Sequence, residues 1–189
     1  AIAVHPDDKR YKEYIGKDVE LPLCKRKIPI IADDYVDMDF GSGAVKITPG
    51  HDFNDYEIGK RHGLSMDSKN NIILGDESSF EPISVLDKHA KICGCAPKNF
   101  HELNRFEARK KILANLESED LIAGIEEYET SLPFGDRSDE ILEPFLTDQW
   151  YVDTKKMALS AIDSIKNGDI KFVPSNWEKT YFQWLENIQ

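Results

Sequence analysis

The sequence predicts an α+β domain in which a small, barrel-like β-sheet core is flanked by helices. Short apolar runs separated by turn residues follow one another through the first 50 residues, which is typical of closely spaced strands. Later segments carry apolar residues at helical spacing, with capping residues in front of them. The length of 189 residues suits one compact domain with a short appendage.

The expected strands crowd the N-terminal part of the chain. Turn residues at 33–34 and 41–43 separate the apolar runs there. Because these strands are short and follow each other closely, they favour a meander or a small barrel. The expected strands cover 1–4, 19–23, 27–32, 35–40 and 44–48, with weaker signals at 72–74 and 83–86.

Two helices are expected in the middle of the chain. Asp52 is in a position to cap the first helix, with Asp55 three residues further on and Gly63 placed to end it. A longer helix is expected after Asn99, with Glu102 at the capping-box position. Its apolar side carries Leu103, Phe106, Leu113 and Leu116.

The C-terminal part of the chain has a looser pattern. Strand and loop are expected over 125–150, a helix over 154–166, a turn at 167–169, a strand at 170–173 and an aromatic-rich helix at 177–189. Both ends look cut, since the first residues are strand-like without a preceding turn and the last helix has no cap. We therefore expect a piece of a longer polypeptide: a domain at 1–148 lacking its N-terminal strand, then a connector at 149–189.

The composition excludes several classes of protein. The 35 acidic and 24 basic residues give a formal net charge of −11, which argues against a free-standing nucleic-acid binder. No apolar stretch is long enough to cross a bilayer, and the N-terminus has no signal-peptide layout. These features predict a protein without a membrane partner. The expected location is the cytoplasm, and the expected state is a monomer.

The cysteines leave two interpretations open. Cys93 and Cys95 lie between His89 and His101, and such ligands could hold zinc, but their spacing matches no usual zinc site. The preferred interpretation is that these thiols and Cys24 are free and reduced, without a metal.

Polar residues concentrate where the last early strand passes into the first helix. Lys46 and Thr48 share one strand face, and the following loop brings Asp52 and Asp55 close to the strand end. Carboxylates in the first turn of a helix tend to stay ionised. An ionised carboxylate beside a cation and a hydroxyl suits a zwitterion-like ligand such as an aminoacyl group. The ordinary structural explanation also stands: a helix cap beside a solvated lysine.

Other candidate residues have equally open roles. His51 could act as a general base next to Asp52, or be a neutral histidine bonded to backbone groups. The basic run 25–27, with Lys25 and Arg26, and Arg109 on the long helix could touch one or two phosphates, although solvated surface is the default there.

Several ordered blocks of the sequence closely resemble the editing domain inserted in valyl-tRNA synthetases, also called connective polypeptide 1. The Lys-x-Thr-Pro and His-Asp-x-x-Asp pairing at 46–55 favours the valyl members over the isoleucyl and leucyl ones, which usually have His at the position of Lys46. The matching blocks are IPIIADDYVD at 28–37, FGSGAVKITPGHDFNDYE at 40–57, RFEARK at 105–110, EPFLTDQWYV at 143–152 and KFVPSNWEK at 171–179.

The resemblance implies an aminoacyl-tRNA deacylase within a ligase. Asp55 corresponds to the family's central aspartate, which holds the amino group or hydroxyl of the substrate. Around it, the family match places a substrate-binding set of Lys46, Thr48, Asp52, Phe40 and His51. Water would be the nucleophile, with no metal and no cofactor in this domain; ATP would be used by the catalytic domain of the parent chain, to which 149–189 would lead back.

The resemblance also implies a substrate and partners. An apolar pocket cannot strongly reject threonine in place of valine, a case for which valyl-tRNA synthetase is itself the standard example. The partners would be the 3′ end of valine tRNA carrying threonine and the remainder of the synthetase. A threonine-rich segment upstream of Ala1 would complete the pocket, so we expect weak or no deacylase activity from this chain alone. The alternative is a noncatalytic protein-docking module of a larger cytosolic enzyme.

Overall fold

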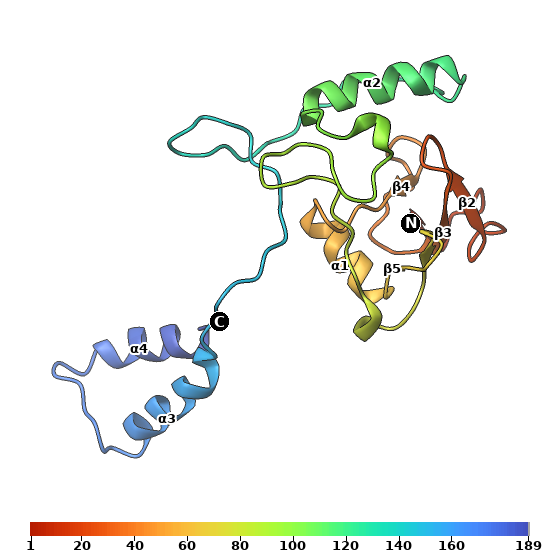
Figure 1. Cartoon of the computed structure of the whole chain (residues 1–189). Coiled ribbons are helices and arrows are strands. Elements are labelled where there is room, and N and C mark those ends of the chain that lie inside the picture. Colours follow the sequence, from red (N-terminus) through yellow and green to blue (C-terminus); the bar gives the residue numbers. More distant parts are fainter. Residues whose placement is uncertain (189) are drawn as a thin grey trace. The chain divides into compact units, whose positions relative to one another are not determined.

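The structure is a computed structural model that describes residues 1–188, drawn in Figure 1. The chain divides into two compact units, Ala1–Leu146 and Thr147–Gln189. The first unit holds the sheets and the helices α1 and α2, and the second holds α3 and α4. The assignment of 1–148 and 149–189 to an editing domain and a connector stays a prediction.

A four-stranded sheet organises the first unit. Its order is β2-β3-β1-β4, in which β1 pairs parallel to β3 and antiparallel to β4. The strands are β1 Ile2–Val4, β2 Asp18–Leu21, β3 Arg26–Ala32 and β4 Ala44–Lys46, and a separate hairpin joins β5 Ser65–Met66 to β6 Ile72–Ile73. The mixed α and β architecture is therefore confirmed. The sheet is open at both edges, so the expected barrel-like closure is not confirmed.

The apolar core lies between this sheet and helix α1, Phe53–Arg61. Ile47 follows β4 and is buried, whereas Lys46 and Thr48 on either side of it are exposed. This alternation confirms the predicted strand face that displays Lys46 together with Thr48. The buried cluster comprises Ala1, Ala3, Ile28, Ile31, Val36, Ile47, Ile58, Leu64 and Ile72.

The predicted strand at 35–40 is wrong, and aspartate side chains explain why. Residues 34–39 form turns and bends instead. The Asp33 carboxylate accepts a hydrogen bond from the Tyr35 backbone at 3.0 Å, and the Asp37 carboxylate accepts one from the Asp39 backbone at 2.9 Å. Such local bonds replace the ladder bonds that a strand would need.

The other weak strand signals also overestimate the sheet content. Residues 83–86 contribute only an isolated bridge between Leu86 and Ile92. Within 125–150, the only bridge in the described chain joins Phe134 to Ile141, and 170–173 forms no strand. Short 3-10 turns lie at Glu77–Ser79 and Lys98–Phe100.

Helix α2, Arg105–Ser118, begins later than the sequence predicts. Its N-cap is Asn104, and Glu107 completes the capping box. The predicted cap, Asn99, belongs to the preceding 3-10 turn, and Glu102 has a φ of 63°. The left-handed conformation at Glu102 is incompatible with a helix running through it, so the second Asn-x-x-Glu pattern is the one that caps.

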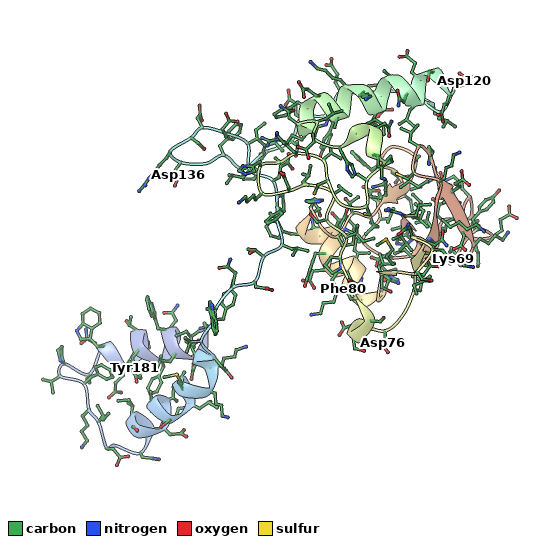
Figure 2. All side chains as sticks on the ribbon, viewed as in Figure 1. Lys69, Asp76, Phe80, Asp120, Asp136 and Tyr181 are labelled. Carbon is green, nitrogen blue, oxygen red and sulfur yellow. The ribbon has the colours of Figure 1, made fainter. Side chains whose placement is uncertain are left out.

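The second unit is a pair of helices, α3 Thr154–Lys166 and α4 Trp177–Glu186. The prediction for α3 is confirmed in full, and α4 begins as predicted. Tyr181, labelled in Figure 2, packs with its ring centroid 5.1 Å from Phe172. Across the residues that the structure describes, no helix is long and apolar enough to span a membrane.

Candidate functional site

A hydrogen-bonded pair joins the end of β4 to the first turn of α1. The backbone N–H of Thr48 donates to Oδ2 of Asp55 at 2.6 Å, and Oγ1 of Thr48 donates to the same oxygen at 2.9 Å. Asp55 is buried, with 8% of its surface exposed. A carboxylate at this place is stabilised by the N-terminal end of the helix as well as by the two donors.

Asp52 caps the N-terminus of the same helix, α1. It is the N-cap residue of α1, and its Oδ1 accepts a hydrogen bond from the backbone N–H of Asp55 at 2.9 Å. This is the capping role expected from the sequence. Asp52 is exposed, and its Oδ1 orients the residue that carries the Asp55 carboxylate.

Lys46 brings a positive charge close to this pair. Desolvation by the surrounding walls lowers the pKa of Lys46, and the negative charge of Asp55 partly opposes that effect by raising it. The ammonium group is therefore electrostatically linked to the buried carboxylate. The structure thus brings together a cation, a hydroxyl and two carboxylates, which is the combination that suits an aminoacyl ligand.

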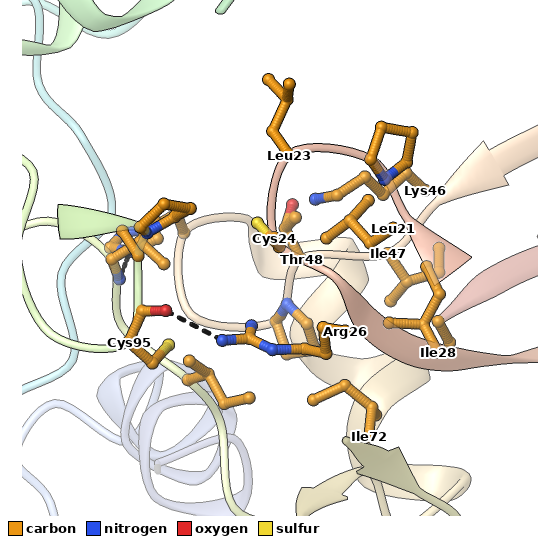
Figure 3. A pocket seen from close by; sticks show the side chains of 18 of the residues that line it. Leu21, Leu23, Cys24, Arg26, Ile28, Lys46, Ile47, Thr48, Ile72 and Cys95 are labelled. Atoms are coloured by element: carbon orange, nitrogen blue, oxygen red, sulfur yellow. Dashed lines mark hydrogen bonds between the residues drawn. The ribbon is translucent and has the colours of Figure 1, made fainter. Parts of the chain in front are cut away.

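A cavity of about 480 Å³ opens next to Lys46 and Thr48. Figure 3 shows its labelled lining residues, which come mainly from β2, β3 and the end of β4. His51 and residues 81–85 and 92–97 complete the wall, which is predominantly apolar. Asp52, Asp55 and Phe40 do not line this cavity. Asp55 is connected to the cavity wall by its hydrogen bond with Thr48, which does line it.

His51 connects three segments of the chain. Its Nδ1 lies 3.1 Å from the carbonyl oxygen of Pro144, and its Nε2 accepts hydrogen bonds from the backbone of Val85 at 2.9 Å and of Leu86 at 3.3 Å. With Nε2 as acceptor, Nδ1 carries the proton and donates to Pro144. Both ring nitrogens are thereby engaged by backbone groups, so this geometry suits a neutral residue that shapes the cavity wall.

The remaining predicted site residues make no hydrogen bond to the Thr48–Asp55 pair within residues 1–188. Phe40 is 59% exposed, and its ring packs edge-on against Tyr128 with a centroid distance of 5.5 Å. Lys25 and Arg109 are exposed, on the turn after β2 and on α2 respectively. Arg26 instead points into the cavity wall, where its Nη2 donates to the carbonyl oxygen of Cys95 at 2.9 Å.

The histidines and cysteines considered for a zinc site do not come together as metal ligands within residues 1–188. His101 Nε2 lies 2.8 Å from the carbonyl oxygen of Ala96. Residues 1–188 contain no group of three or more histidine, cysteine or acidic side chains arranged to hold a metal ion. The cysteines are free thiols, and burial raises the pKa of both Cys24 and Cys93. A raised thiol pKa disfavours the thiolate that would act as ligand or nucleophile.

Sequence reasoning missed the inward position of Arg26. A signal was present, because Arg26 and the buried Ile28 are two residues apart on one strand and share a face. The basic neighbours at 25 and 27 obscured it, since a charged run usually indicates surface. The contributions of Cys95 and of the wall at 81–85 had no such signal, because they depend on how distant loops pack.

Comparison with known proteins gives a consistent result. The model of the family described as "Leucyl-tRNA synthetase, editing domain" matches residues 8–117. A valine-tRNA ligase of Legionella pneumophila (strain Lens) is 51% identical over 189 residues, and one of Coxiella burnetii is 48% identical over 189 residues. One of Bradyrhizobium diazoefficiens is 49% identical over 191 residues. Each alignment covers 100% of this chain but only 19% or 20% of the relative, so the chain spans about a fifth of their length.

Proposed function

Because this chain belongs to the family of aminoacyl-tRNA synthetase editing domains, we propose that it hydrolyses the ester between a wrongly attached amino acid and its tRNA. The proposed substrate is threonine on valine tRNA. The similarity to valine-tRNA ligases supports the choice of tRNA, and the near-isosteric shapes of threonine and valine support the choice of amino acid. The observation that carries the proposal is the Thr48–Asp55 pair beside a cavity that Lys46 also lines.

The pair offers a physical basis for choosing threonine over valine. The buried Asp55 carboxylate can accept a hydrogen bond from the ammonium group or the hydroxyl of threonine, in addition to the bonds from Thr48. Valine has a methyl group where threonine has its hydroxyl. Valine would displace water from Oδ1 of Asp55, to which Thr48 does not donate, and offer it no donor in return. That penalty is far stronger than the one an apolar pocket can impose on threonine.

The reaction needs a water molecule and a stabilised oxyanion. The water oxygen bonds to the ester carbonyl carbon, the bond from that carbon to the ribose oxygen breaks, and a proton passes to the ribose oxygen. Lys46 supplies positive charge where the carbonyl oxygen becomes negative. In this proposal the side chains act by orienting and by charge, without a covalent intermediate on the protein and without a metal.

The proposal extends to the protein around this domain. The partners are the flexible 3′ end of valine tRNA and the remainder of a synthetase that uses ATP in another domain, in the cytoplasm. The barrel-like sheet core expected from the sequence also belongs to this proposal.

The test is the accuracy of the full-length enzyme. Asp55→Ala should let threonyl-tRNA accumulate when the enzyme is supplied with threonine, valine tRNA and ATP. Asp34→Asn is the matched control, since Asp34 is an exposed aspartate outside the pair and should leave accuracy unchanged. Unchanged accuracy of Asp55→Ala would rule out the proposed role of this residue.

A further inference from the structure

Arg26 has hydrogen-bonding capacity that the protein does not use. Its Nη2 donates to the Cys95 carbonyl, as the dashed line in Figure 3 shows. Its Nε is buried and has no hydrogen-bond partner among the described residues, and no ion pair of Arg26 occurs there either. An unpaired donor in the wall of an apolar cavity is costly unless a ligand satisfies it.

Lys46 is a second cation in the wall of the same cavity. Desolvation is the main cause of its lowered pKa, and the positive charge of Arg26 lowers it further. The carboxylate that acts on Lys46 is Asp55, which does not line the cavity. Glu81 does line it, but its side chain is exposed and pairs with neither cation within residues 1–188. The cavity therefore presents two like charges on mainly apolar walls.

We propose that Arg26 and Lys46 form an oxyanion subsite that binds a phosphate or carboxylate group of the aminoacyl-nucleotide substrate or of its product. This inference rests on the proposed function and deepens it. The planar guanidinium presents donors in a fork that matches both kinds of oxyanion. The cavity volume of about 480 Å³ lies in the range of small-molecule sites, and its apolar walls can contact a base.

The oxyanion has two possible sources, which binding measurements on this chain distinguish. If it is the phosphate next to the terminal nucleoside, adenosine monophosphate should bind about tenfold more tightly than adenosine, as one charge-assisted hydrogen bond predicts. If it is the carboxylate released by hydrolysis, threonine should bind about tenfold more tightly than threoninamide. In either case Arg26→Met should remove the preference. The proposal is overturned if neither pair of ligands shows a preference that depends on Arg26.

Two further variants keep this test decisive. Arg26→Lys retains the positive charge but not the forked donors of the guanidinium, so it should retain only part of the preference for the oxyanion ligand. This variant replaces Arg26→Met in the test if Arg26→Met does not fold. Arg137→Met removes an exposed arginine of the turn at 136–138, to which no binding role is assigned, and should change nothing. A non-hydrolysable threonyl-adenosine amide has neither phosphate nor free carboxylate, so its binding should be independent of Arg26. If the amide binds but the oxyanion preference is absent, only the subsite fails. If the amide binds beside Thr48 and Asp55 neither in this chain nor in the full-length enzyme, the proposed function fails.

Discussion

At the scale of single residues, the Thr48–Asp55 contact is the most informative feature of the molecule. Two donors from one threonine converge on one carboxylate oxygen, at 2.6 and 2.9 Å. This arrangement fixes the direction of the carboxylate before any ligand arrives, which is the form of preorganisation that binding and catalysis require.

The side-chain half of this contact can be tested separately. Thr48→Val removes the Oγ1 donor and keeps the backbone donor, so the free energy of unfolding should fall by about 1 kcal/mol. Thr48→Ser keeps the hydroxyl and should be closer to the original protein. Urea denaturation measures both variants. A Thr48→Val protein as stable as the original would show that the hydroxyl contributes nothing to holding Asp55.

The sequence predicted part of this site for clear reasons. Strand alternation placed Lys46 and Thr48 together, and capping preference placed Asp52 at the helix start, because both rules are local. The contacts of His51 with Val85 and Pro144 could not be predicted, since they join segments 34 and 93 residues away. Arg26 lay between these cases, because its face was predictable but the loop of Cys95 opposite it was not.

At the scale of elements, an ion-pair cluster fastens the end of β3 to the end of α1. The buried carboxylate of Asp33 accepts from Arg61 Nε at 2.8 Å and Nη2 at 2.6 Å, and lies 2.9 Å from Nε2 of His62. Burial raises the pKa of Asp33, but hydrogen bonds from Arg61, the Tyr35 backbone and His62 outweigh it and lower that pKa to about 2. The cluster sets the position of α1, whose first turn carries Asp55.

This cluster predicts a specific dependence of stability on pH. The pKa of Asp33 is lowered on folding from the ordinary value of 3.8 to about 2, so its stabilisation is complete above about pH 4 and is lost as the pH falls towards 2. The shift corresponds to about 2 kcal/mol. Asp33→Asn should lower the free energy of unfolding at pH 7 by about that amount and flatten its decline between pH 4 and 2. Asp34→Asn is the control, and an unchanged acid decline in Asp33→Asn would contradict the account.

The elements also show where local sequence rules stop being decisive. Helix α3 begins and ends as predicted because its cap and its apolar spacing have no competitor. Two Asn-x-x-Glu patterns, beginning at Asn99 and Asn104, could each cap the start of α2. The 3-10 turn at Lys98–Phe100 and the left-handed backbone of Glu102 exclude the first, so Asn104 is the N-cap. Asp33 and Asp37 convert the expected strand at 35–40 into turns through bonds to the backbone.

At the scale of the whole molecule, the sheet order is the feature that the sequence could not supply. The parallel pairing of β1 with β3 brings Ile2 opposite Ile30, across a connection that no local pattern specifies. The closure of a barrel also depends on pairing between strands that are distant in the sequence. The barrel was predicted from the number and spacing of the strands alone, which do not specify that pairing, and the sheet order does not confirm the closure.

Under the proposed function, the net charge of −11 predicts how binding of an RNA 3′ end should depend on salt concentration. The sequence predicts phosphate contacts for only three cations, Lys25, Arg26 and Arg109. With about three contacts to a single strand, the logarithm of the binding constant should fall with the logarithm of salt concentration with a slope of about −2. Fluorescence anisotropy with a short single strand ending in CCA measures the slope. A much steeper slope would indicate an extended cationic surface, contrary to a domain that holds only the 3′ end.

The most direct test of the central claim is a crystal structure of this chain with a non-hydrolysable threonyl-adenosine analogue. We expect density for the threonyl group beside Lys46, Thr48 and Asp55, with its ammonium or hydroxyl group within hydrogen-bonding distance of the Asp55 carboxylate. An empty site beside these residues, with the analogue absent or bound elsewhere, would contradict the account and favour a noncatalytic docking module.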